Sequence, residues 1–224
     1  ELFPAVAIER IVQELEKARL FSKLRLMLLG LAEFGLLEVI FPSLQGTPLT
    51  EIEKRLAPTH NYPAKALLIT QLLPLFPPMT LDEQMALCQM LKLSNLDQQF
   101  VTFLFHAFEL LHTKRSIALS EWAYFYANTF APVSLQIVAA HTAHPTHFLQ
   151  EHEKRMELLK RSIERIHRHD PVVKSGDLLK AGIRPGKAMG HLLREADRIS
   201  IDEQIEESAA ILERLKQLPE WGKF

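Results

Sequence analysis

Cysteine and glycine are scarce in this sequence, and a long hydrophobic run is missing altogether. The 224 residues include one cysteine, Cys88, which excludes a disulfide framework within the chain and is typical of a reducing compartment. Cys88 lies among apolar positions of a predicted helix, so we interpret it as an inert buried thiol rather than a nucleophile. No stretch of eighteen apolar residues and no basic-then-apolar leader occurs. We therefore expect a cytoplasmic protein with no membrane partner.

A strong excess of charge of one sign is also missing. The formal net charge is −1 at pH 7, so the chain is not a polycation and we expect no DNA partner. The charge is unevenly distributed: residues 151–198 contain twelve Lys or Arg against eight Asp or Glu, and residues 199–224 contain three against six. A basic segment within a neutral chain is one mark of a phosphate-bearing partner.

The groups that carry common enzyme chemistry are missing as well. We find no closely paired acids such as Asp-x-Asp, no Walker loop, no nucleophile elbow and no Cys/His arrangement. The segment Lys-Ser-Gly-Asp at 174–177 resembles a nucleotide-binding Gly-Ser turn, but the pair of carboxylates that should follow it is absent. We assign no catalytic residue to this chain.

Apolar residues recur at helical spacing along nearly the whole chain, and no segment shows the period-2 alternation of a strand. The sequence therefore predicts an all-α fold. Ile8, Ile11, Val12 and Leu15 form one face of a first helix. Further helices are predicted at 98–112, 120–140, 147–169 and 202–217.

Capping residues predict several helix ends. Ser22 is predicted to be the N-cap of the second helix, and Gly35 its end, because glycine adopts the left-handed conformation at little cost. Thr80 with Glu83 has the capping-box pattern. Asp202 is predicted to be the N-cap of the last helix.

Four histidines, His141, His144, His147 and His152, crowd together in the sequence. Metal ligands must converge at a defined spacing, and Pro145 interrupts any single helix through these residues. We interpret them as solvated or partly buried histidines and assign no metal-binding residue.

Half of the eight glycines occur within residues 176–193. Gly182 is predicted to end one helix and Pro185 to occupy the first position of the next, where its missing N–H would be unpaired anyway. Gly186 and Gly190 lie four residues apart and leave one helix face bare.

Two interpretations of this bare helix start stay open. A neighbouring helix can pack closely against it, or a phosphate can bind there, because helix N-termini attract anions and Arg184 and Lys187 lie beside it.

Three arginines share one face of the predicted helix 147–169. Arg161, Arg165 and Arg168 recur at i, i+4 and i+7, while Met156, Leu159, Ile163 and Ile166 form the inward stripe. This arginine face is either a solvated surface or a second phosphate contact.

The start of the chain resembles the neck region of class II tRNA nucleotidyltransferases, the CCA-adding enzymes and related bacterial poly(A) polymerases. The family pattern is Ser-x-Glu-Arg-Ile-x-x-Glu-Leu, then Gly-Leu-Leu and Phe-Pro-Glu-Leu. The matching positions are Glu9, Arg10, Ile11, Glu14, Leu15, Gly35, Leu36, Leu37, Phe41, Pro42 and Leu44. Ala7 and Ser43 depart from the pattern.

The far end resembles the tail signature of the same family, Pro-x-x-x-x-Gly-x-Asp-Leu followed by Gly-x-x-Pro-Gly-x-x-x-Gly-x-x-Leu. The matching positions are Pro171, Gly176, Asp177, Leu178, Gly182, Pro185, Gly186, Gly190 and Leu193. Both motifs occur in the right order, whereas residues 46–150 match mainly in helical character.

The resemblance implies an elongated neck, body and tail, with the end of the neck at 1–45, the helical body at 46–150, and the basic helix and tail at 151–224. The family's head domain, with its carboxylate pair, Mg²⁺ and ATP or CTP, is expected before Glu1. The chain would then be a fragment of an enzyme, inactive alone and without a cofactor of its own.

In the family, body and tail hold the acceptor and TΨC arms of tRNA, mainly through the phosphate backbone. The resemblance therefore implies a tRNA or other RNA partner and favours phosphate binding by Arg161, Arg165, Arg168, Arg184, Gly186 and Lys187. CCA addition and poly(A) addition stay open as alternatives for the parent enzyme. A helical protein-interaction scaffold without an RNA role is the alternative to both, and the oligomeric state is left open.

Overall fold

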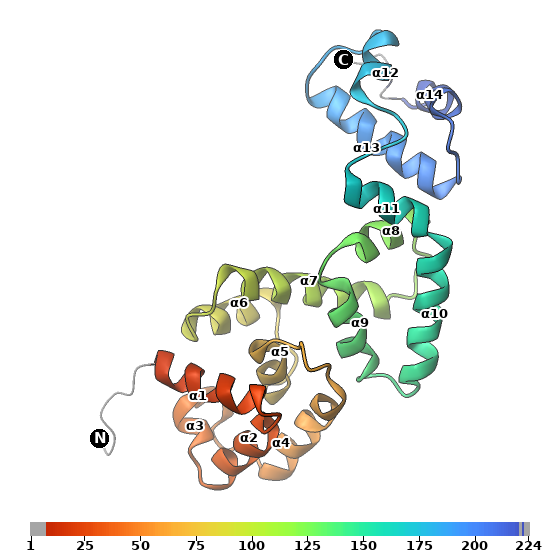
Figure 1. The fold of residues 1–224 in the computed structure, drawn as a ribbon. Helices are drawn as coiled ribbons and strands as arrows, with labels where there is room; N and C mark the ends of the chain where they lie inside the picture. The colour runs from red at the N-terminus through yellow and green to blue at the C-terminus, as the bar shows by residue number, and fades with distance from the viewer. Residues whose placement is uncertain (1–7, 220, 222–224) are drawn as a thin grey trace. The chain divides into compact units, whose positions relative to one another are not determined.

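The computed structural model of the chain describes residues 8–219 and residue 221, and within them it is all-α (Figure 1). Fourteen α-helices and three 3₁₀ helices (η) are formed, and this part of the chain contains no strand. The prediction of an all-α fold is confirmed. The helices are α1 Ile8–Leu20, α2 Leu24–Glu33, α3 Leu37–Ile40, η1 Pro42–Leu44, α4 Leu49–Leu56, η2 Ala57–Asn61, α5 Leu68–Leu72, η3 Leu73–Leu75, α6 Leu81–Met90, α7 Asn95–His112, α8 Leu119–Ala127, α9 Ala131–Ala139, α10 Pro145–Leu158, α11 Lys160–Arg168, α12 Ser175–Lys180, α13 Lys187–Asp202 and α14 Ser208–Lys216.

The chain forms two compact units. The first contains the described part of Glu1–Thr113 together with Pro132–Leu149, and the second contains Lys114–Ala131 with the described part of Gln150–Phe224. The predicted division into neck, body and tail names functional regions and stays a prediction. No helix in the described ranges is long and apolar enough to cross a membrane.

The first unit is built around a core of buried leucine and isoleucine side chains from α1 to α6. Ile8, Ile11 and Val12 pack against this core, and Leu15 is fully buried within it, so the predicted face of α1 is confirmed. Cys88 is also buried there, as the interpretation of an inert thiol requires.

Two of the helix ends predicted in the first unit are confirmed, and one is not. The amides of Gly35 and Leu36 donate to the carbonyls of Ala32 and Leu31, which closes α2 at a left-handed glycine. The Thr80–Glu83 capping box also forms. The prediction for Ser22 is wrong: this residue has φ +56° and ends α1, and α2 follows Lys23 without a capping side chain.

The predicted helix 120–140 is interrupted and forms two helices. Asn128 Oδ1 accepts a hydrogen bond from the Phe130 amide at 2.9 Å, and this local turn separates α8 from α9. Pro132 then lies in the first turn of α9, where a missing N–H costs nothing. Asn128 and Pro132 were the sequence signals for this break.

The predicted helix 147–169 is likewise two helices. The first of them, α10, begins at Pro145, a residue suited to a first helical position, and ends at Leu158. Leu159 separates α10 from α11 and is buried. The second of these helices, α11, packs against α8 of the same unit.

The second unit is organised around α13, which packs against α8, α12 and α14 (Figure 1). One core cluster around it contains Val173, Leu178, Met189, Leu192, Ala196, Ile199, Ile211 and Leu215. The prediction that Asp202 caps the last helix is wrong. Asp202 ends α13, its Oδ1 accepts the Ser120 amide at the start of α8 at 2.8 Å, and the last helix begins at Ser208.

Candidate nucleic-acid interface

The glycine-rich segment joins α12 to α13 in the second unit. Gly182 has φ +88°, and the amides of Gly182 and Ile183 donate to the carbonyls of Leu179 and Leu178 at 3.0 Å each. This is the paired hydrogen-bond pattern of a glycine that closes a helix. The prediction that Gly182 ends a helix is confirmed.

The start of α13 differs from the prediction by two residues. Pro185 was predicted to be the first helical residue, but α13 begins at Lys187 and Gly186 is the residue before it. Gly186 has φ +151° and ψ −167°, a conformation that non-glycine residues rarely adopt, and it has no side chain to cap the helix. The backbone therefore requires glycine at 186 and leaves the first turn of α13 without a capping side chain.

The glycines do not serve close helix packing. A Cβ atom built on Gly186 or on Gly190 would meet no atom of the described residues within 4 Å. The side chains that α13 packs into the core, Met189, Leu192 and Ala196, lie at other positions around the helix. The interpretation that these glycines admit a neighbouring helix is wrong, and the face at Gly190 is open.

Basic residues line the side of α13 opposite its core contacts. Lys187, His191, Arg194 and Arg198 recur at i, i+4, i+7 and i+11, and the lysine and both arginines are exposed. Arg198 forms ion pairs with Glu195 at 2.9 Å and with Asp202 at 3.3 Å. The sequence analysis missed Arg194, although this periodicity was visible in the sequence.

We define the α13 cation group as Lys180, Arg184, Lys187 and Arg194. All four are exposed, and none forms an ion pair with a described residue. Most other basic side chains of the second unit have a carboxylate partner, for example Lys154 with Glu151 and Lys216 with Glu213. Positive charge without an internal partner is therefore concentrated around the start of α13.

The predicted arginine face lies on α11 and is only partly open. Arg161 is 82 % exposed, and its Nη1 lies 3.3 Å from Glu206. Arg165 is half-buried and its Nη2 donates to the hydroxyls of Ser162 at 3.4 Å and Ser200 at 3.2 Å. The Arg165 Nε is buried without an acceptor in the described part of the chain.

Arg161 and Arg165 line a hollow of about 610 Å³ between α11 and the chain that follows α13. Ser162, Ser200 and Gln204 contribute hydroxyl and amide groups, and Glu206 contributes negative charge at the same place. Arg168 is exposed and lies outside the residues that line this hollow.

The two sets of predicted phosphate ligands lie at opposite ends of α13. Lys187 begins the helix, and Ser200, which contacts Arg165, is thirteen residues further on. At 1.5 Å per residue the two positions are about 20 Å apart along the helix. They are therefore two separate contact points rather than one site.

The four histidines lie in different surroundings. His144 and His147 are exposed, and His141 is hydrogen-bonded to the Tyr62 hydroxyl at 2.6 Å. His152 is buried, with its Nδ1 2.7 Å from the Tyr126 hydroxyl. Nowhere in residues 8–219 or at 221 do three His, Cys, Asp or Glu side chains converge as metal ligands do.

Comparison with known proteins gives one family. The family model described as "tRNA nucleotidyltransferase domain 2 putative" matches residues 66–215, which include every predicted phosphate ligand. No curated protein and no solved structure matches the chain. Because the match covers about two thirds of the sequence, the chain belongs to the tRNA nucleotidyltransferase domain 2 family.

Proposed function

We propose that this chain is the RNA-holding part of a template-independent RNA nucleotidyltransferase, and that it binds the phosphate backbone of tRNA or another RNA. The observation that carries the proposal is the α13 cation group: four exposed basic side chains that have no carboxylate partner among the described residues, in a chain of this family. Unpaired surface cations keep their full attraction for a polyanion, whereas an internal ion pair must first be broken.

The start of α13 suits a phosphate for three reasons. Its first turn has no capping side chain, so its N–H groups are available to an anion. Lys187 and Arg194 extend from the same side of the helix, each about one turn from Gly190 and on either side of it along the axis. The open face at Gly190 leaves room for a sugar-phosphate backbone to approach.

The arginines of α11 contribute unequally in this proposal. Arg168 is exposed and makes no ion pair with the described residues, so it is available for a phosphate. Arg161 must break its ion pair with Glu206 before its guanidinium group can bind a phosphate of the RNA. Arg165 is held by two serine hydroxyls and contributes less than the other two.

Nucleotide addition belongs to a part of the parent enzyme that holds Mg²⁺ and ATP or CTP. Two-metal phosphoryl transfer needs carboxylates that hold the ions, and the described residues do not bring such a set together. The residues of this chain therefore bind and orient RNA for a reaction carried out elsewhere. CCA addition and poly(A) addition are both compatible with this role.

The experiment that tests the proposal compares two double variants in an RNA titration over a series of salt concentrations. The probe is tRNA lacking its 3′-terminal CCA, followed by fluorescence anisotropy. Lys187→Ala with Arg194→Ala removes two unpaired cations, and Lys154→Ala with Lys216→Ala removes two paired cations of the same unit as the matched control.

The first variant is expected to lose affinity and to reduce the log–log salt slope by about 0.7–0.9 for each lost phosphate contact. The control is expected to change the slope much less, because its two lysines are already paired. Equal losses of affinity in both variants would mean that RNA binding depends only on the total charge of the unit. The assignment of the contact to α13 would then be rejected. Unchanged binding in both would reject RNA binding by the α13 cation group, the observation that carries the proposal.

A further inference from the structure

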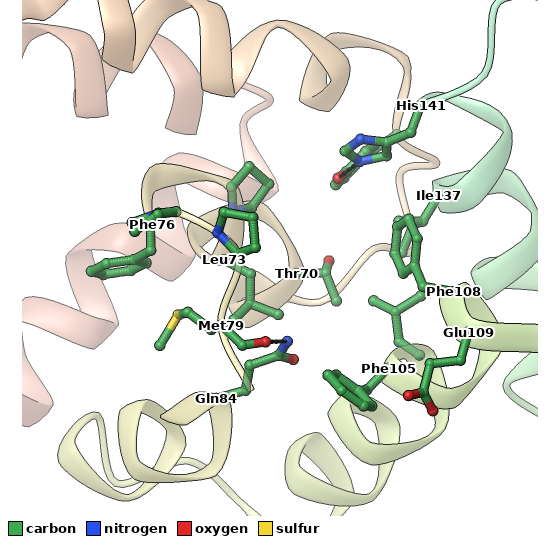
Figure 2. A pocket seen from close by; sticks show the side chains of 15 residues that line it. Thr70, Leu73, Phe76, Met79, Gln84, Phe105, Phe108, Glu109, Ile137 and His141 are labelled. Carbon is green, nitrogen blue, oxygen red and sulfur yellow. Dashed lines mark hydrogen bonds between the residues drawn. The ribbon is translucent and has the colours of Figure 1, made fainter. Parts of the chain in front are cut away.

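A cavity of about 420 Å³ opens at the surface of the first unit. Its walls come from α5, η3, the connector 76–79, α6, α7 and the end of α9 (Figure 2). A volume of this size is usual for a small-molecule site. The cavity lies entirely within the first unit, and none of the predicted RNA contacts belongs to it.

Aromatic and aliphatic side chains form most of the wall. Figure 2 shows Leu73, Phe76 and Met79 on one side and Phe105, Phe108 and Ile137 on the other. The three phenylalanine rings are only half-buried, although such rings contribute most when they are covered. Three partly exposed rings around one hollow indicate a site for an apolar, ring-shaped ligand.

Most of the donor groups in the cavity are already bonded within the protein. The Tyr62 hydroxyl and His141 Nε2 share a hydrogen bond of 2.6 Å. Thr70 donates its hydroxyl proton to a backbone carbonyl three residues earlier, at 2.7 Å. The Gln84 side-chain amide donates to the Met79 carbonyl at 3.2 Å, the contact drawn in Figure 2. What remains for a ligand is mainly hydrogen-bond acceptors.

Two side chains of the cavity keep free acceptor atoms, and one of them, the Glu109 carboxylate, is negatively charged. Glu109 Oε2 lies 2.9 Å from His106 Nδ1, and its Oε1 contacts no donor in the described part of the chain. Gln84 Oε1 is a second acceptor. No lysine or arginine is among the fifteen described residues that line the cavity. Burial, and the nearby His112 to a smaller degree, lower the pKa of His141, which disfavours a positive charge on this ring.

We propose that this cavity binds a small aromatic amine. The ring of the ligand lies between the phenylalanine side chains, and its ammonium group faces the Glu109 carboxylate and Gln84 Oε1. Cation–π attraction from the same phenylalanine rings adds to the preference for a positively charged ligand. The site does not depend on the RNA role proposed above, because it uses other residues in the other unit.

Three indole compounds test the site, because they share a ring and differ in charge. Tryptamine is positive at pH 7, indole is neutral and indole-3-acetate is negative, and their binding is compared by isothermal titration calorimetry. Tryptamine is expected to bind about two- to fivefold more tightly than indole, the range for a charge pair that is partly exposed, and indole-3-acetate more weakly than indole.

Two substitutions separate the charge from the apolar wall. Glu109→Gln is expected to remove the difference between tryptamine and indole while indole binding is kept, because this side chain is exposed and the fold does not need its charge. Glu53→Gln, at an exposed position of α4 outside the cavity, is the matched control and is expected to keep the wild-type order. Leu73→Trp fills the cavity and is expected to weaken all three compounds at least tenfold, with circular dichroism to check the fold.

Two results would overturn the proposal whatever the behaviour of Leu73→Trp. One is the absence of saturable tryptamine binding by the unmodified chain. The other is a preference for tryptamine that persists unchanged in Glu109→Gln.

Discussion

The two glycines at the start of α13 are expected to respond in opposite directions to the same substitution. Gly186→Ala places a Cβ atom on a residue with φ +151° and ψ −167°, a region that costs a non-glycine residue about 1–3 kcal/mol. Gly186→Ala should therefore lower the free energy of unfolding of the second unit by about that amount.

Gly190→Ala should raise the free energy of unfolding of the second unit. Gly190 lies inside α13, and a Cβ atom there would contact nothing within 4 Å in the described part of the chain, so alanine is expected to add no clash. Alanine restricts the unfolded chain and favours the helix, which together stabilise by about 0.5–1 kcal/mol. Each variant adds one methyl group to the chain, and the two sites are four residues apart. Each variant is therefore the control for the other.

Urea unfolding followed by tryptophan fluorescence measures both changes. Trp122 and Trp221 are the two tryptophans of the sequence, and both belong to the second unit, so their emission reports its unfolding. The midpoint is expected to fall for Gly186→Ala and to rise for Gly190→Ala at an unchanged slope. A loss of about 1 kcal/mol or more in Gly190→Ala would show that this face is covered, and the interpretation of an open surface would be refuted.

Three further predictions concern protonation, the α11 arginines and catalysis. Burial, and then the nearby Arg155, lower the pKa of His152 from 6.5 to about 4. As the pH falls, His152 is therefore protonated in the unfolded chain before it is protonated in the folded chain. The free energy of unfolding should therefore fall as the pH drops from about 6.5 to about 4, and His152→Gln should flatten that dependence in urea titrations; an equally steep variant would contradict the assignment. Glu206→Gln should release Arg161 and raise RNA affinity up to about fivefold at low salt, whereas unchanged or weaker binding in anisotropy titrations would show that the pair does not compete with RNA. The chain alone should add no nucleotide to tRNA lacking its 3′ end with ATP, CTP and Mg²⁺, and robust incorporation of labelled nucleotide would mean that the active site was misplaced.

The sequence alone was sufficient for features that depend on neighbouring residues. The helical periodicity predicted the all-α fold, and glycine or a capping box predicted the ends at Gly35, Thr80 and Gly182. These predictions succeeded because the deciding interactions are hydrogen bonds within four or five residues. Ser22 failed for the same local reason, since a left-handed helix end competes with an N-cap at one position.

The tertiary structure alone decided which polar groups are free. Sequence spacing gave Arg161, Arg165 and Arg168 one equal face, but contacts with Glu206 and Ser200, about forty residues away along the chain, separate them. Asp202 bonds the start of α8, eighty-two residues earlier, instead of capping the helix that follows it. The aromatic cavity of the first unit likewise joins segments from Tyr62 to His141. A side chain's partners across such distances depend on how the helices pack, and no local pattern in the sequence encodes them.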